Sequence, residues 1–296
     1  MVTEFLDLSS CSLHTVPLLH NLWRLRTILL AQNAILHLGD GSLKGLQSLQ
    51  ILDLNGNKIG NLSVSFSLGL ESLTHLFLAH NLLQSISKYS LQHLHNLELL
   101  NLQGNLIFFL DSGAFRSLTK LRHLVLKNNL LQSLGNDIFS VLQRLEFLDL
   151  SGNQISSLPS GVFTPLYSLT FLNLQNNQLR HLLFQTLSSL PSPGTLLLLS
   201  SNPWECDCDS QRMFGKLRSL QRISLQDGED LNCADPPALK GRAITSLHTQ
   251  LCVAETVTVL MISLTVVVTV VGAIVTADRS RKKSPRNHGN EMSGQE

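Results

Sequence analysis

Residues 97–118 read LELLNLQGNLIFFLDSGAFRSL, and this stretch decides the fold. Leu97, Leu100 and Leu102 are followed by Asn105, and further apolar residues come after it. Moving the frame by 24 residues in either direction recovers the same pattern, and the asparagine recurs at Asn33, Asn57, Asn81, Asn105, Asn129, Asn153 and Asn177. Six equal intervals indicate a repeated structural unit whose copies stack on one another.

Each position of the unit has a physical role. Leu100 and Leu102 alternate around a polar residue, which predicts a short strand with one buried face. The asparagine follows the strand, and its amide can satisfy the backbone groups that a tight turn would otherwise bury without partners. Apolar residues five places later also point inward in this reading, namely Leu38, Leu62, Ile86, Leu110, Leu134, Leu158 and Leu182. Phe115, Phe139 and Phe163 recur ten places after the asparagine and thicken the core on the convex side.

The spacing L-x-x-L-x-L-x-x-N-x-L with this period resembles the leucine-rich repeat. The resemblance implies an α/β solenoid, a curved horseshoe whose parallel strands line the concave side. One copy cannot bury its own apolar face, so the stack is the folding unit. We assign residues 25–200 to repeats of 24 residues, with an irregular last copy that ends at Asn202.

The beginning of the chain already fits the repeat. Residues 3–13 read TEFLDLSSCSL, with Cys11 where the asparagine is expected. We expect Cys11 to be a buried thiol that packs as a small apolar side chain, and a disulfide with a missing segment is the alternative. Residues 1–24 then form a truncated first repeat without an N-terminal cap or secretory signal, which predicts an incomplete or alternatively started version of a longer protein.

Composition argues against several classes of function. The chain of 296 residues has a net charge of +1, so it lacks the basic excess of a nucleic-acid-binding protein. The 11 histidines are scattered, and no nucleophile elbow, phosphate loop or metal motif is found. We therefore expect no enzyme, no cofactor, no metal and no small-molecule substrate.

Four of the five cysteines follow the last repeat: Cys206, Cys208, Cys233 and Cys252. An even set in one short segment predicts disulfides and an oxidising compartment. A zinc site is the alternative, but 24 and then 18 residues separate the later cysteines and there is no CxxC pair. These spacings favour disulfides.

Residues 202–252 carry NPWECDC, then one cysteine before PPALKGR and another before the apolar segment that follows. This arrangement resembles the C-terminal cap of extracellular leucine-rich repeat proteins, such as platelet glycoprotein V, Toll-like receptors, variable lymphocyte receptors and the gamma subunits of BK channels. The resemblance implies the pairs Cys206–Cys233 and Cys208–Cys252. We assign 201–253 to this cap, with Trp204 covering the last coil and a short helix over Met213–Leu220.

Residues 256–277 contain no charge. As a helix they would span about 33 Å, enough for a hydrocarbon core of about 30 Å, whereas the alternative is a buried core helix. We assign 254–278 to one transmembrane helix. Arg279, Arg281, Lys282 and Lys283 follow, which predicts a short cytoplasmic tail over 279–296, an extracellular N-terminus and a plasma-membrane location. Asn61, in an N-x-S sequon on the flank, is then a candidate glycosylation site.

The side chains between the core leucines of each strand are predicted to face the concave surface. They are more apolar than a merely solvated face, and such exposed patches are typical of interaction sites. The alternative is that neighbouring side chains simply pack against each other. Our candidate ligand-binding residues are Ile51, His75, Phe77, Leu99, His123, Val125, Phe147 and Phe171.

These features favour a non-enzymatic single-pass type I cell-surface protein, either a receptor, an adhesion molecule or a ligand tether. Its partner would be a protein ligand or a membrane co-receptor. An auxiliary subunit of an ion channel or signalling receptor, acting through its membrane helix, is the alternative. A third possibility is a nonfunctional product whose cysteines never meet an oxidising compartment.

Overall fold

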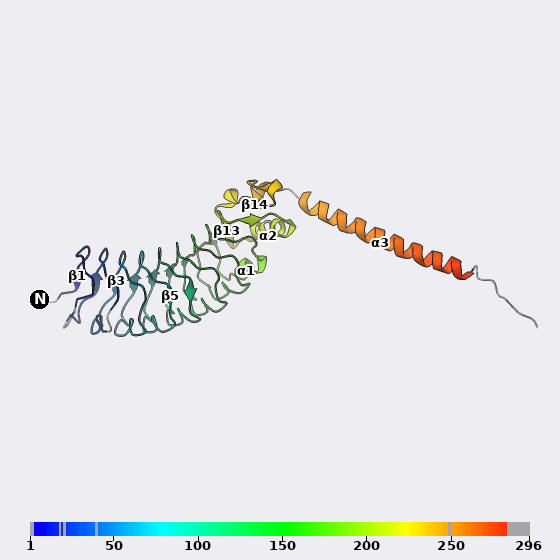
Figure 1. Cartoon of the computed structure of the whole chain (residues 1–296). Helices are drawn as coiled ribbons and strands as arrows, with labels where there is room; N and C mark the ends of the chain where they lie inside the picture. Colours follow the sequence, from blue (N-terminus) through cyan, green and yellow to red (C-terminus); the bar gives the residue numbers. More distant parts are fainter. Residues whose placement is uncertain (1–2, 18, 20–21, 39–40, 248–249, 283–296) are drawn as a thin grey trace, which may run out of the picture. The chain divides into compact units, whose positions relative to one another are not determined.

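The computed structural model describes residues 3–17, 19, 22–38, 41–247 and 250–282. It divides the chain into two compact units, Met1–Leu247 and His248–Glu296. The first unit is a parallel-strand solenoid followed by a small cysteine-containing segment, and the second contains one long helix (Figure 1). The expected α/β solenoid is therefore present. The predicted tail is 279–296, and its residues after Lys282 lie outside the described part of the chain.

One parallel sheet organises the solenoid. Its ten strands lie in the order β1-β2-β3-β4-β6-β8-β9-β10-β11-β13, and every pairing is parallel. Nearly all come from successive coils, because each coil contributes one strand of three or four residues where leucines alternate with other side chains. The strands are β1 Phe5–Asp7, β2 Thr27–Leu29, β3 Ile51–Asp53, β4 His75–Phe77, β6 Leu99–Asn101, β8 His123–Val125, β9 Phe147–Asp149, β10 Phe171–Asn173, β11 Thr195–Leu198 and β13 Ile223–Leu225.

The asparagines form a continuous ladder along the solenoid. Asn105 Nδ2 donates to Leu102 O in its own coil at 3.0 Å and to Leu78 O in the preceding coil at 2.9 Å. Its Oδ1 accepts from Leu83 N at 3.1 Å. The same three bonds recur for Asn57, Asn81, Asn129, Asn153, Asn177 and Asn202, which pair groups that are otherwise buried in the turn.

The core follows the repeat with one departure. The central apolar residue of each strand is fully buried from Ile28 in β2 to Leu197 in β11, and so are Phe115, Phe139 and Phe163, with rings 139 and 163 stacked at 6.3 Å. Leu110, however, is only half-buried, whereas the six equivalent residues in the other coils are buried. Leu110 therefore packs against the core as expected, but it is less buried than its equivalents. The cause is a hollow between its coil and the next.

Cys11 also differs from expectation. Its backbone N–H donates to Asn33 Oδ1 at 3.0 Å, so it occupies the ladder register, but the free thiol is exposed. The Sγ lies 3.4 Å from Ser9 O. Burial of a ladder residue requires a coil on each side, and within the described residues only the Asn33 coil lies against this one.

The residue before each ladder position adopts a left-handed backbone. Gly56, Gly104 and Gly152 alternate there with Gln32, His80, Asn128 and Asn176, and all have φ between 52° and 67°. A Cβ added to Gly104 would lie 2.6 Å from His80 Nδ1, and one added to Gly152 would lie 2.1 Å from Asn128 Oδ1. The side chain of one coil thus covers the glycine of the next, which explains the alternation.

The segment after the last coil closes the sheet. Strand β13 pairs with β11, and Asp227 accepts hydrogen bonds from Leu199 N and Ser200 N at the end of β11. Trp204 is fully buried, meets Phe214 edge to face at 5.3 Å and donates from Nε1 to Leu199 O at 3.3 Å. The Asp227 carboxylate thus pairs the backbone N–H groups at the end of β11, and the Trp204 indole covers the last coil of the solenoid.

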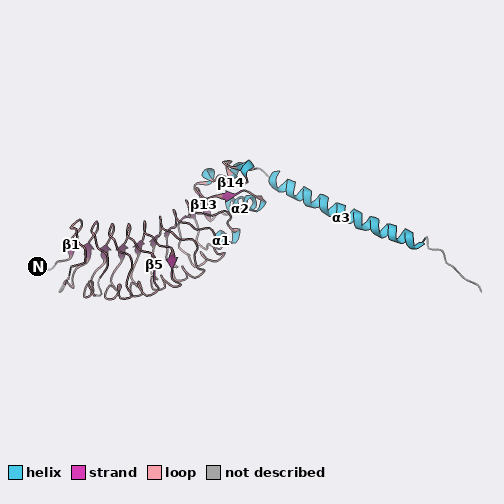
Figure 2. Ribbon diagram, viewed as in Figure 1, coloured by secondary structure: helices cyan, strands magenta, loops and turns pink. Residues whose placement is uncertain are grey.

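The helix expected over Met213–Leu220 is α2, which spans Cys208–Ser219. It begins five residues earlier because the Asp207 side chain accepts from Ser210 N at 2.8 Å and caps it. The remaining elements are β5 Ser85–Ile86, β7 Phe109–Leu110, α1 Phe184–Ser188, β12 Trp204–Glu205, η1 Gly228–Asp230, β14 Cys233–Asp235, η2 Pro237–Leu239, η3 Ile244–Ser246 and α3 Gln250–Lys282. Figure 2 shows the helices and the short strands in separate colours.

Candidate protein-binding surface

The register of the main sheet aligns the side chains between the core leucines into two columns. The first concave column is Phe5, Thr27, Ile51, His75, Leu99, His123, Phe147, Phe171 and Leu196. The second concave column is Asp7, Leu29, Asp53, Phe77, Asn101, Val125, Asp149, Asn173 and Leu198. All eight candidate residues therefore lie on one sheet face, in register across neighbouring strands.

Aromatic rings make contact over one part of the first concave column. Phe147 and Phe171 stack with ring centroids 4.5 Å apart and an interplanar angle of 4°. His123 lies 6.0 Å from Phe147 with its ring tilted. The three side chains are half-buried rather than fully exposed, because each leans on its neighbour. They form a continuous half-exposed aromatic strip that offers apolar area with little side-chain freedom to lose.

The other candidates are more dispersed. His75 and Phe77 share a strand with ring centroids 6.4 Å apart, and His75 Nδ1 lies 2.9 Å from Thr74 Oγ1. Ile51, Leu99 and Val125 are half-buried in register with them.

Charged residues border the aromatic strip, and the sequence pattern did not single them out. Arg122 and Glu146 stand directly before β8 and β9 and form an ion pair across the two coils. Thr170, at the same position before β10, donates from its hydroxyl to Glu146 O at 2.9 Å. The strip therefore has a polar rim of the kind that surrounds the apolar centre of many protein interfaces. Phe5, which extends the first concave column and is 58% exposed, was also missed.

Several polar side chains of the second concave column form hydrogen bonds with backbone N–H groups of their own turn. The side-chain oxygen of Asp53 accepts from Asn55 N, that of Asn101 from Gln103 N, and that of Asp149 from Ser151 N, all at 2.9–3.0 Å. These bonds fold the turn that leaves each strand. Asp7 makes the same contact with Ser9, and the backbone bond from Ser9 holds the pKa of the Asp7 carboxyl below its ordinary value.

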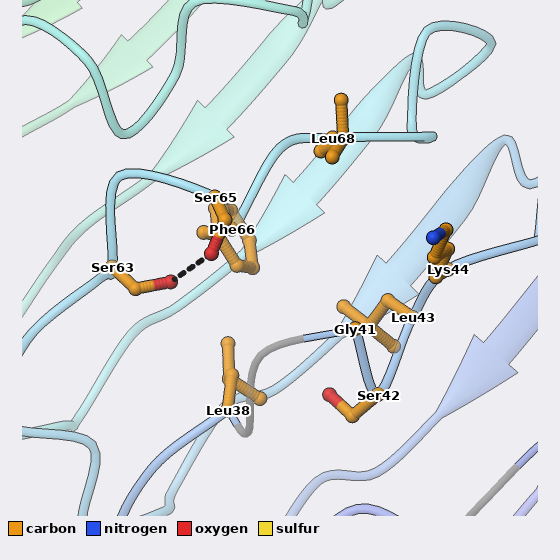
Figure 3. A pocket seen from close by; sticks show the side chains of 9 residues that line it. All are labelled: Leu38, Gly41, Ser42, Leu43, Lys44, Ser63, Ser65, Phe66 and Leu68. Atoms are coloured by element: carbon orange, nitrogen blue, oxygen red, sulfur yellow. Dashed lines mark hydrogen bonds between the residues drawn. The ribbon is translucent and has the colours of Figure 1, made fainter.

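The described residues contain no group of three or more His, Cys, Asp or Glu side chains placed to hold a metal ion. A small hollow beside Ser42, Ser63 and Phe66 has a volume of about 10 Å³ (Figure 3). That volume is about the size of one water molecule, so the hollow is not a ligand site. Ser42 Oγ is buried there without a hydrogen-bond partner among the described residues.

The remaining site residues lie away from the sheet. The structure joins Cys206 to Cys233 with Cα atoms 5.6 Å apart, and Cys208 is also disulfide-bonded. The side chain of Cys252 lies outside the described residues, so its pairing with Cys208 stays a prediction. Asn61 is exposed on the flank after its ladder asparagine, and its glycosylation likewise stays a prediction.

Comparison with known families agrees with the geometry of the coils. Residues 23–68, 59–107 and 102–155 match a family model described as Leucine rich repeat, and residues 143–192 match one described as Leucine Rich repeats (2 copies). The chain belongs to the leucine-rich repeat family. The family matches end at residue 192, before the segment that closes the sheet.

Two solved structures of leucine-rich repeat proteins are similar to this chain. One is a chain of the octameric complex of Latrophilin 3, Unc5D and FLRT2, with a TM-score of 0.69 and 28% identity, covering 78% of this chain and 69% of that chain. The other is human 5T4 (Wnt-activated inhibitory factor 1, trophoblast glycoprotein), with a TM-score of 0.67 and 26% identity, covering 81% of this chain and 90% of that chain. These likenesses support an extracellular leucine-rich repeat protein that interacts with other proteins.

A curated relative matches over a shorter region. Phospholipase A2 inhibitor beta of Elaphe climacophora is 34% identical over 65 residues, which is 22% of this chain. The aligned part spans 19% of that relative.

The second unit contains a segment suited to a membrane. Within α3, Val257–Ala277 is long and apolar enough to cross a bilayer, and none of its side chains is buried. It is the one such segment in the described part of the chain. Together with the extracellular leucine-rich repeat neighbours, it fits a single-pass protein of the plasma membrane.

Proposed function

We propose that this chain is a non-enzymatic cell-surface protein that binds a protein ligand through its concave sheet, as a receptor, adhesion molecule or ligand tether. The observation that carries the proposal is the strip of His123, Phe147 and Phe171, which leaves stacked rings half-exposed beside the Arg122–Glu146 ion pair. Rigid aromatic side chains next to Arg are common energetic centres of protein interfaces. The remaining candidates, Ile51, His75, Phe77, Leu99 and Val125, would extend the contact along the sheet.

The proposed domain organisation follows from the same features. The repeats occupy 25–200, the disulfide-linked cap 201–253, the membrane helix 254–278 and a cytoplasmic tail 279–296. The basic residues after the helix support an extracellular N-terminus. Epitope tags at the two ends, stained on intact and on permeabilised cells, test the orientation: an N-terminal tag that stains only after permeabilisation would contradict it.

The ligand-binding proposal can be tested on the full chain expressed in cells. A collection of tagged secreted proteins and receptor ectodomains serves as the probe, and binding is read by flow cytometry. Any protein that binds is then applied to F147S and F171S, with Y167S as the matched control because Tyr167 is an exposed aromatic residue outside the main sheet. We expect binding to fall at least about tenfold for the two phenylalanine variants and to stay unchanged for Y167S. Unchanged binding in all three would contradict the concave site.

The auxiliary-subunit alternative rests on α3, whose span has no buried side chain and is free to contact a membrane partner. Exchanging Val257–Ala277 for an unrelated membrane helix separates the two functions. Loss of activity with intact ligand binding would favour the auxiliary subunit, and retained activity would exclude it.

A further inference from the structure

The flank of the solenoid opens between two coils. Strands β5 and β7 form a short parallel pair, with Ser85 beside Phe109 and Ile86 beside Leu110. The next coil does not continue this pair, because no backbone hydrogen bond among the described residues joins 108–111 to 131–138. A hollow of about 400 Å³ lies there instead, lined by Phe108, Phe109, Asp111, Ser133, Gly135 and Asp137. We call it the flank hollow.

Two exposed aromatic side chains lie at the flank hollow among polar ones. Phe108 and Phe109 are 58% and 54% exposed, although they are consecutive aromatic residues at the edge of a sheet. Leu110, whose equivalents in the other coils are buried, is left half-buried by the same opening. Three exposed leucines, Leu82, Leu106 and Leu130, stand in register on the same flank one residue after the ladder.

The charges at the flank hollow are acidic. Asp111 and Asp137 both line it, and no described lysine or arginine forms an ion pair with either. Asp111 Oδ2 accepts a hydrogen bond of 3.3 Å from Lys88 N. Lys88 and Arg116 contact an aromatic ring instead, since Lys88 Nζ and Arg116 Cζ lie 5.0 and 5.8 Å from the Tyr89 ring centroid. An occupant with positive charge would therefore match this rim.

The third feature of the flank hollow is the edge of β7 that faces the next coil, where no backbone hydrogen bond among the described residues is formed. An edge strand with an unpaired side can accept an additional strand, whose backbone bonds give affinity while alternate side chains give specificity. In an added strand, successive side chains point to opposite faces. By the same rule Phe109 and Asp111 lie on one face of the chain, so a segment with both apolar and basic side chains on each face would contact the phenylalanines and the aspartates together.

We propose that the flank hollow is a second binding site, separate from the concave sheet, for an extended basic segment of a partner protein that pairs with the free edge of β7. Val or another branched apolar side chain contacts Phe108 and Phe109, and Lys or Arg contacts Asp111 and Asp137. The site does not depend on the concave columns, so a protein ligand on the sheet and a basic segment on the flank can bind together.

The test uses the full chain in detergent micelles and a fluorescent octapeptide of sequence VVKKVVKK, which carries valine and lysine on both faces of an extended strand. Fluorescence anisotropy compares it with the same peptide carrying glutamate in place of lysine, and with one whose alternate backbone amides are methylated. We expect the lysine peptide to bind at least about tenfold more tightly than either comparison peptide. Equal binding of the glutamate peptide, equal binding of the methylated peptide, or no binding of the lysine peptide would overturn the proposal.

Variants locate the binding. F109S and D137N should weaken the lysine peptide about tenfold and about threefold, because one removes the apolar contact and the other an exposed charge. Y167S and F147S, at exposed or half-exposed aromatic residues elsewhere, should leave it unchanged. Binding that survives F109S and D137N would overturn the proposal, since the peptide would then bind another surface. Sedimentation of the same samples identifies a different occupant: if F109S dissociates a self-associated species and no peptide binds, the flank hollow holds a second copy of the chain and the proposal is wrong.

Discussion

Asn128 and Asn129 are neighbours in the chain, yet Asn129 belongs to the buried ladder and Asn128 to the exposed left-handed turn. Asn129 lies in the ladder, is buried, and bonds to Leu102 O, Leu126 O and Ile107 N across two coils. Asn128 is exposed in the left-handed turn, with φ of 54°, and its side chain covers Gly152. Asparagine therefore stabilises the stack through buried hydrogen bonds at position 129, whereas at position 128 it is suited mainly to the left-handed backbone.

The largest expected effect breaks the ladder. N129A should lower the free energy of unfolding by about 3 kcal/mol, because several buried backbone groups lose their partners. N128A should cost only about 1 kcal/mol, the preference of alanine against the left-handed region. Chemical denaturation followed by circular dichroism compares the two. Similar losses for both variants would show that the ladder is not the stabilising region.

A smaller effect is expected in the turn region. G104A should destabilise the protein by about 2 kcal/mol, since φ is +65° and the new Cβ would displace the exposed His80 ring. G60A is the matched control, because a Cβ there meets nothing within 4 Å and the backbone is not left-handed. It should change stability by less than about 0.5 kcal/mol. Thermal melts of both variants provide the comparison, and an equally stable G104A would refute the covering role of His80.

Much of the architecture could be predicted from the repeat. The period gives the strands, the ladder and both concave columns, because those positions face identical neighbours in every coil. It does not give the flank hollow, since burial of Leu110 depends on the path of residues 131–138 in the next coil. Nor does it give the turn bonds of Asp53 and Asp149, which depend on the side-chain oxygen reaching a particular N–H two residues later. The eight candidate residues therefore follow from the register, whereas Phe5 and the Arg122–Glu146 pair at the border of the aromatic strip do not.

A third prediction concerns the concave sheet. F171S should reduce stability by about 1 kcal/mol, because it removes one stacked pair on a half-exposed face, whereas the ladder variant removes buried bonds. Denaturation curves of F171S and N129A measured side by side test this order. If F171S were as destabilising as N129A, the aromatic strip would belong to the core rather than to a binding surface.

The smallest effect is a pH dependence at the first strand. The Ser9 backbone N–H donates to Asp7 and lowers the pKa of its carboxyl, so the stabilisation is present above the ordinary value of 3.8 and is lost as pH falls below it through the folded value. NMR titration of the Asp7 carboxyl should show a midpoint below 3.8. D7N removes the titrating group and is the control for pH-dependent unfolding. A midpoint at or above 3.8 would contradict the turn contact.

Long side chains and glycines alternate in the left-handed turns of successive coils, and this alternation limits which numbers of coils can be removed or duplicated. From Gln32 to Asn176, each long side chain at this position is followed one coil later by glycine, and Asn176 is followed by Ser201. Removing one coil would bring two long side chains, or two glycines, against each other. Removing or duplicating two adjacent coils restores the order, so the smallest interchangeable module of this solenoid is a pair of coils.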